Sequence, residues 1–349
     1  MPPSSPRRPP PRRPAPLEAP PDVLEGLRAF LDALLRDDVS RRVLARLPKD
    51  FFSLQTAIGA LRLALMRRYV AHFRRQELPT NGRFLWYELE DERVVDKTKA
   101  RGHPGVKGRG IDQTLNGALT DLRERGLVPW SAIADETRSL TNYRGYRSTL
   151  EGALDRLDGV GLDPWLLGGA LAPLILCESR SLAGVLQGLA GEYRCLITST
   201  NGQTAGHLHT EVAPVLSPLS DERAAGIAGP RPVLYLGDWD HQGGQIEAND
   251  RKVLAAYPGY DEDAWERVAL TDVQVRSRGL TPILKYDERY VPRRAHPAVE
   301  TEALGQGLIV ALLRERLEFL LPVPLADVQV REREERAELR RRLSGEGAD

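Results

Sequence analysis

Two short apolar runs that end in acidic residues constrain the fold of this chain more than any other feature. The run Leu174–Cys177 is followed directly by Glu178, and the run 233–237 is followed by Asp238 and Asp240. Runs of this length, bounded by turn residues, predict strands that are buried in a parallel sheet. Ligands of such sheets bind beyond the carboxyl ends of the strands, which is where the three acids stand.

The spacing of the acids predicts a metal site. Asp238 and Asp240 are two residues apart, so on an extended segment both side chains project to the same face. Carboxylates crowded together repel one another unless a cation joins them, and such oxygen donors suit Mg²⁺, with Mn²⁺ as an alternative. We therefore expect Glu178, Asp238 and Asp240 to hold the metal of a phosphoryl-transfer site. The competing explanation is a polar strand end or a helix cap.

Strand and helix patterns alternate around these motifs and predict a small α/β domain at 165–275, with helices on the faces of its sheet. Gly243 and Gly244 open the helix after the second acidic motif, where they either admit a phosphate to its N-terminus or make a tight turn. We expect strands at 174–178, 194–198, 232–238 and 266–270 and helices at 180–191 and 244–256.

The segments before this domain divide into three predicted parts. Residues 1–21 hold ten of the 26 prolines, and we expect a disordered Pro/Arg-rich arm. Apolar residues at helical spacing predict a helical region at 22–78, with four arginines within 67–75 that form either a solvated face or a phosphate-contacting patch. Residues 79–150 follow as a unit of their own.

The unit at 79–150 carries the pattern of a winged helix-turn-helix. A helix capped by Asn81, a basic glycine-rich stretch, an amphipathic helix from Ile111 and an extended piece at 127–130 follow one another. Many small helical domains share this pattern, so it does not by itself specify DNA binding. The expected nucleic-acid contacts are Lys107, Arg109 and Arg123 in this unit and Gly243 and Gly244 in the sheet domain.

Beyond the sheet domain we expect an extension at 276–325, which includes a helix from Glu300 through Phe319, and a charged, mostly helical tail at 326–349. The formal net charge is zero, so no overall basic field indicates a nucleic-acid partner, although a local patch can bind one. Cys177 and Cys195 stand in predicted strands without metal-ligand spacing, so we expect them to be reduced core residues of a cytoplasmic protein. Association with the nucleoid is the alternative location. No apolar run approaches a membrane span, and we expect no membrane partner.

The order of the acidic motifs resembles the Toprim domain of topoisomerases, primases and related nucleases. That domain has a Glu after its first strand, an Asp-x-Asp after its third strand and a glycine turn between them. The A subunit of topoisomerase VI and the meiotic double-strand-break protein also carry a winged helix with a tyrosine before this domain. Here Arg83-Phe84-Leu85-Trp86-Tyr87 looks like the tyrosine segment, and 237–243 resembles the Asp-x-Asp-x-x-Gly element.

Topoisomerase-VI-A-like Toprim proteins of phages and mobile elements resemble the chain further. They share an Asp-x-Thr-Arg stretch, here 135–138, and a late Glu-x-Glu-Ala-Leu, here Glu300 to Leu304. The chain departs from the pattern at His241, where a proline is usual after the Asp-x-Asp. The resemblance covers about half of the chain.

This resemblance implies a homodimeric, type II topoisomerase-like enzyme that cleaves DNA with Mg²⁺. Tyr87 would be the nucleophile of transesterification, Arg83 could activate its phenol, and Glu178 would act with the metal. No G-x-x-x-x-G-K-[ST] loop occurs, so any ATPase would be a separate subunit. Three alternatives stay open: Tyr87 is a core residue, the protein is a hydrolytic Toprim nuclease on DNA or RNA, or it binds nucleic acid without catalysis.

Overall fold

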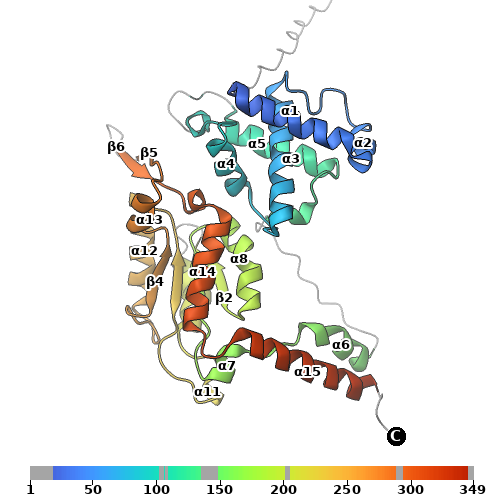
Figure 1. Ribbon diagram of the computed structural model, residues 1–349. Coiled ribbons are helices and arrows are strands. Elements are labelled where there is room, and N and C mark those ends of the chain that lie inside the picture. Colours follow the sequence, from blue (N-terminus) through green and yellow to red (C-terminus); the bar gives the residue numbers. More distant parts are fainter. Residues whose placement is uncertain are drawn as a thin grey trace, which may run out of the picture. The chain divides into compact units, whose positions relative to one another are not determined.

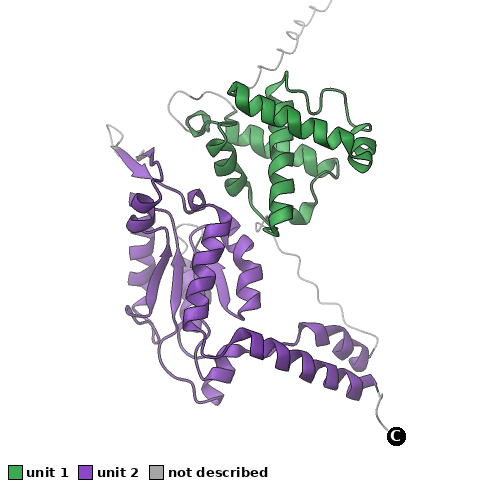
Figure 2. Ribbon diagram, in the orientation of Figure 1, with its two compact units in different colours: residues 1–133 green, residues 134–349 purple. Residues whose placement is uncertain are grey.

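The computed structural model describes residues 19–101, 106, 109–134, 148–200, 205–287 and 294–344. The chain forms two compact units, residues 1–133 and residues 134–349, which Figure 2 distinguishes by colour. The described part of the first unit is helical, and the second contains a parallel sheet with helices, so the expected mixed α/β class is confirmed. Of the expected N-terminal arm, residues 1–18 lie outside the described residues, and Pro21 already begins the first helix.

Unit 1 is a set of helices around one hydrophobic core. Asn81 caps the fourth helix as expected, because its side-chain oxygen accepts a hydrogen bond from the backbone N of Phe84 at 2.9 Å. The helices are α1 (Pro21–Arg36), α2 (Asp38–Leu44), α3 (Ala57–Arg75), α4 (Gly82–Asp91) and α5 (Ile111–Glu124), with the 3-10 turns η1 (Lys97–Lys99) and η2 (Trp130–Ala132).

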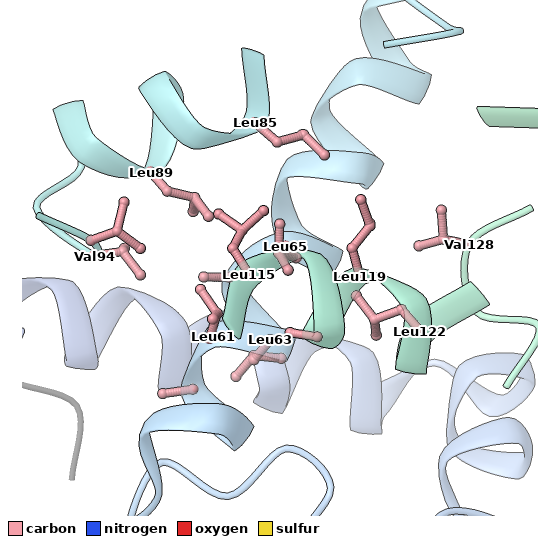
Figure 3. Close-up of a cluster of buried hydrophobic side chains, with 14 of the residues drawn as sticks. Leu61, Leu63, Leu65, Leu85, Leu89, Val94, Leu115, Leu119, Leu122 and Val128 are labelled. Carbon is pink, nitrogen blue, oxygen red and sulfur yellow. The ribbon is translucent and has the colours of Figure 1, made fainter. Parts of the chain in front are cut away.

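One core spans the boundary that the sequence analysis placed at residue 79. Leu61 and Leu63 of α3 are both buried although they are only two residues apart, so α3 needs neighbours on more than one side. Leu27 of α1 belongs to the same core. Leucines of α3, α4 and α5 point toward one another in Figure 3, among them Leu61, Leu65, Leu85, Leu89, Leu115 and Leu119. The regions 22–78 and 79–133 are therefore not separate domains.

Unit 1 has the helix–loop–helix part of the expected winged helix in α4 and α5. Its described residues contain no β-strand, and a single parallel bridge joins Thr80 to Ile133. The extended piece expected at 127–130 enters the turn η2 at Trp130. The assignment to a winged helix therefore stays a prediction.

Unit 2 is built on a four-stranded parallel sheet with the strand order β2-β1-β3-β4. Ile175 of the central strand pairs with Ile197 on one side and with Leu234 on the other. Every residue of β1 and β3 is buried, which explains why both strands are continuous apolar runs. The four expected strands are confirmed, with ends shifted by one or two residues: β1 (Leu174–Cys177), β2 (Leu196–Ser199), β3 (Val233–Leu236) and β4 (Trp265–Ala269).

Helices cover the two faces of this sheet, and Figure 1 shows α8 and α14 on the side opposite to α12. Alternate residues of β1 and β3 pack with Leu208, Leu216 and Leu254 in a core cluster on the α12 face. The helices of this unit are α6 (Thr149–Arg156), η3 (Leu157–Gly159), α7 (Pro164–Gly168), α8 (Arg180–Glu192), α9 (Ala205–His207), the π-helical turn η4 (Leu208–Val212), α10 (Ala213–Leu216), α11 (Ser220–Ala224), α12 (His241–Leu254), α13 (Asp272–Ser277), η5 (Thr301–Leu304), α14 (Gln306–Leu320) and α15 (Leu325–Ser344).

The last third of unit 2 adds a hairpin and two long helices. Strands β5 (Ile283–Asp287) and β6 (Arg294–Ala298) form a separate antiparallel pair. The helix expected from Glu300 through Phe319 is divided at Gly305, whose φ of 81° lies outside the helical region. The charged helix α15 packs along α6 (Figure 1). In the described ranges of the chain, no helix is long and apolar enough to cross a membrane.

Candidate metal centre

Glu178 and Asp238 meet at the carboxyl edge of the sheet, as the sequence predicts. They follow β1 and β3, which are neighbours in the sheet. The backbone N of Asp238 donates a hydrogen bond to Oε2 of Glu178 at 3.0 Å. The ends of the two central strands are thus joined through the first acid.

A second segment from late in the chain fixes Asp238. Trp239 and Val299 form an antiparallel bridge with two backbone hydrogen bonds of 2.9 Å. This bridge brings Thr301 to Asp238, and the backbone N of Thr301 donates to Oδ1 of Asp238 at 2.9 Å. The Thr301 hydroxyl donates to the same oxygen at 3.2 Å. Asp238 Oδ1 is therefore used for structure.

One side-chain oxygen of Asp240 also has a structural role. Its Oδ1 accepts a hydrogen bond from the backbone N of Gly243 at 2.5 Å and so caps α12, which starts three residues earlier than expected. A Cβ on Gly243 would lie 2.5 Å from the carbonyl oxygen of Asp238, whereas nothing lies within 4 Å of a Cβ on Gly244. The tight-turn explanation therefore applies to Gly243, and Gly244 has no steric reason to be glycine.

The second oxygens of both aspartates face a lysine. Nζ of Lys285, on β5, lies 2.9 Å from Oδ2 of Asp240 and 3.7 Å from Oδ2 of Asp238. Oε1 of Glu300 lies 3.8 Å from the same nitrogen. Burial alone would lower the pKa of Lys285, but the hydrogen bond to Asp240 and the surrounding carboxylates raise it, so the ammonium stays charged.

The environment of Glu178 favours its protonated form. Burial raises the pKa of Glu178 to about 7, and the charges of Asp238 and Asp240 act in the same direction. The hydrogen bond from the backbone of Asp238 and the charge of Lys285 oppose this increase. At neutral pH Glu178 can therefore either hold or release a proton.

The donor set fits a hard cation, although the described residues contain no three-membered group of His, Cys, Asp or Glu side chains that is placed to hold a metal. The Oδ2 atoms of Asp238 and Asp240 already converge on one positive charge, that of Lys285. Carboxylate oxygens of this kind are the ligands of Mg²⁺ and Mn²⁺. A metal here would be held by Asp238 and Asp240, with Glu178 beside them.

A pocket of about 460 Å³ adjoins these acids. Arg267 lines it, but its guanidinium donates to the carbonyl oxygens of Gly237 and Asp238 at 2.9 and 2.6 Å and to Glu247. Arg267 thus supports the acidic loop. The other lining residues are Asp238, Trp239, Asp240, His241, Gly244, Leu270, Thr271, Asp272, His296 and Pro297, and the two imidazole rings stack with their centroids 4.9 Å apart.

Tyr87 lies in unit 1, on α4, with a cation against its ring. Nζ of Lys97 donates a hydrogen bond to the phenol oxygen of Tyr87 and lies 4.1 Å from the ring centroid. Tyr87 is half-buried, whereas the preceding Leu85 and Trp86 are buried in the core. Arg83, the activating residue expected from the sequence, is exposed on the same helix. The arrangement argues against a purely core role for Tyr87.

Two of the residues expected to contact nucleic acid, Arg109 and Arg123, have local partners. The Arg109 guanidinium donates to the backbone oxygen of Gln113 at 2.8 Å. Arg123 lies 4.0 Å above the ring of Trp130, which is 56% exposed, and donates to its backbone oxygen. Lys107 and the stretch 135–138 lie outside the described residues.

Three of the four arginines at the end of α3 also have partners on the protein. Arg67 and Arg68 form ion pairs with Glu92, and Arg75 forms one with Glu77. Ion pairing of this kind favours the charged-face explanation over a phosphate-contacting patch.

Sequence reasoning missed three residues that contact the candidate metal centre, namely Lys285, Thr301 and Arg267. Thr301 had a signal, because it lies within the late Glu-x-Glu-Ala-Leu segment that the chain shares with topoisomerase-VI-A-like proteins. A lone lysine on a short strand gives no such signal. In comparisons with protein-family models, curated proteins and solved structures, no match to this chain was found.

Proposed function

We propose that this chain is a Mg²⁺-dependent DNA-cleaving enzyme of the Toprim type, similar to the A subunit of topoisomerase VI. The observation that carries the proposal is the convergence of Asp238 Oδ2 and Asp240 Oδ2 on one cation position beside Glu178. This position lies at the carboxyl edge of a parallel sheet, where such domains bind ligands. Manganese is the alternative ion, and RNA is the alternative substrate.

The residues of the proposed centre would have different roles. Asp238 and Asp240 would bind the metal, which when bound stabilises charge on the oxygens of the reacting phosphate. Glu178, which lies beside them at the same edge of the sheet, would carry a proton to or from the reacting groups. Thr301 and Arg267 hold the aspartates and their loop in position.

Tyr87 is the proposed nucleophile. Its phenol oxygen would lose its proton to solvent water and form a bond to phosphorus as the bond from phosphorus to the leaving sugar oxygen breaks. The leaving sugar oxygen would take up a proton from solvent, so that the step balances. The Lys97 ammonium would stabilise the negative charge that develops on the phenol oxygen when its own proton leaves. The Lys97–Tyr87 contact is the observation that favours this reaction over hydrolysis by metal-activated water.

Covalent adduct formation tests the proposal. Wild-type protein, Tyr87→Phe and the control Tyr69→Phe are incubated with supercoiled DNA and Mg²⁺ or Mn²⁺, and protein–DNA adducts are separated after denaturation. We expect adducts with wild type and with Tyr69→Phe, and none with Tyr87→Phe or with the double variant Asp238→Asn, Asp240→Asn.

The other outcomes select the alternatives. Nicks with free ends, at equal rates in wild type and Tyr87→Phe, would identify a hydrolytic nuclease and end the transesterase proposal. Salt-sensitive binding without cleavage under any of these conditions would identify a binding module, because neutralised phosphates release counterions.

A further inference from the structure

The Lys285 ammonium lies where the metal ligands of the proposed centre converge. It is within 2.9 Å of Asp240 Oδ2 and 3.7 Å of Asp238 Oδ2, the two oxygens that are not used by Gly243 or Thr301. The aspartate side chains are 6% and 13% exposed, so their charges are poorly screened by water. Without a positive charge nearby, these carboxylates would repel each other strongly.

An ammonium and a divalent metal compete for these oxygens. Mg²⁺ lies about 2.1 Å from its oxygen ligands and demands a regular octahedral arrangement. A lysine nitrogen that stays 2.9 Å from Asp240 Oδ2 would then lie within a few ångströms of the ion, where two positive charges repel. Binding of the metal therefore favours movement of the ammonium away from these oxygens.

The Lys285 ammonium can move away from the aspartate oxygens. Its side chain is 39% exposed, and rotation about its side-chain bonds moves the ammonium toward solvent without a change in the backbone. It stands on β5, whose only partner among the described strands is β6, outside the four-stranded sheet that carries the acids. The cation and its carboxylates are thus on separate elements of unit 2.

We propose that Lys285 is an exchangeable internal cation: it holds Asp238 and Asp240 together in the metal-free protein and is displaced when the divalent metal binds. This inference rests on the proposed metal centre and adds to it a residue that sets the metal concentration at which the centre fills. Removal of the competing charge should tighten metal binding and at the same time destabilise the metal-free protein.

Calorimetric titration of the full chain with Mn²⁺ alone tests the exchange. We compare wild type with Lys285→Gln, with Lys285→Arg, which keeps the charge, and with Lys252→Gln, which removes an exposed lysine of α12 in the same unit. We expect Lys285→Gln to bind Mn²⁺ about tenfold more tightly than wild type, after allowance for the partial exposure of the lysine. Lys285→Arg and Lys252→Gln should remain near wild type.

A second measurement uses thermal unfolding without metal. Lys285→Gln should have a lower Tm than wild type in the presence of a chelator, and millimolar Mn²⁺ should restore it, because a ligand that binds only the folded state stabilises that state. Addition of Asp238→Asn to Lys285→Gln should abolish the restoration. Together the two measurements separate competition from a general loss of folding.

Two results would contradict the proposed exchange of Lys285 for the metal. Only the second of them would also contradict the proposed metal centre. If wild type binds Mn²⁺ and Lys285→Gln binds it equally or more weakly, Lys285 does not compete, and the proposed metal centre stands without it. If neither protein binds Mn²⁺, with or without DNA, the metal centre itself is wrong and the exchange falls with it.

Discussion

The backbone N of Asp238 lies 3.0 Å from Oε2 of Glu178 and donates a hydrogen bond to it, which ties the ends of the two central strands together. This contact places the first acid of the site against the second, although 60 residues separate them in the chain. It also anchors the loop that continues to Asp240 and α12. The geometry of the proposed metal centre depends on such backbone contacts as much as on the carboxylates.

Thr301 should matter for metal binding because it fixes Asp238 through two hydrogen bonds. Thr301→Val removes the hydroxyl and keeps the backbone N–H, so Asp238 loses one of these bonds. We expect about 3- to 10-fold weaker Mn²⁺ binding and a loss of about 1 kcal/mol in the free energy of unfolding. Thr301→Ser, which retains the hydroxyl, is the control for calorimetry and urea unfolding. Equal affinities in all three proteins would show that this hydroxyl does not orient Asp238.

Two adjacent glycines of α12 should respond in opposite ways to alanine. A Cβ on Gly243 would meet the carbonyl oxygen of Asp238 at 2.5 Å, whereas the position of a Cβ on Gly244 is open. We expect Gly243→Ala to lower the free energy of unfolding by about 2 kcal/mol or more. Gly244→Ala should raise it by up to about 1 kcal/mol through helix propensity. Urea unfolding measures both, and a tolerated Gly243→Ala would contradict the close approach.

Asp250 should make the stability of the protein depend on pH. It is 1% exposed on α12, and its Oδ2 has no hydrogen-bond partner among the described residues. Burial raises the pKa of Asp250 from 3.8 to about 7, and the charges of Glu178 and Glu247 add to this. Between these two values the unfolded chain has released the proton while the folded protein retains it. The contribution of Asp250 to stability therefore falls as pH rises toward 7.

Replacement of Asp250 by asparagine tests this pH dependence. The gain in unfolding free energy of Asp250→Asn over wild type should grow between pH 5 and pH 8, by an amount on the order of 3 kcal/mol. It should level off above about pH 7. The exposed Asp263→Asn is the control, measured by urea unfolding at each pH. A difference between Asp250→Asn and wild type that is constant with pH would mean that Asp250 is already ionised at pH 5.

Lys97 should control the rate of adduct formation without being needed for the fold. It stands on η1 and contacts the Tyr87 phenol oxygen. We expect Lys97→Met to slow adduct formation by about 100-fold, a typical cost for loss of a charged group that stabilises a reacting oxygen. Lys97→Arg should recover part of the rate, and the neighbouring Lys99→Met serves as the control. Unchanged single-turnover rates in Lys97→Met would remove Lys97 from the reaction.

The sequence predicted the sheet unit closely because its strands are buried on both faces. Such strands, β1 and β3 among them, are short apolar runs whose identity does not depend on distant neighbours. The meeting of Glu178 with Asp238 follows from the rule that parallel strands present their carboxyl ends at one edge. The start of α12 was predicted less accurately, because Asp240 is equally typical of a metal ligand and of a helix cap.

The tertiary structure alone decided which residues complete each site. The structure has no domain boundary at residue 79, because α3 buries more than one face. The helices α1, α4 and α5 pack against these faces in one hydrophobic core. Lys97 contacts Tyr87 because the chain turns back after α4, and helical spacing cannot predict such a contact. Lys285 reaches Asp240 from 45 residues away along the chain. A lysine pairs with the carboxylates that the fold brings close to its ammonium. The residues around Lys285 in the sequence therefore do not indicate which carboxylates these are.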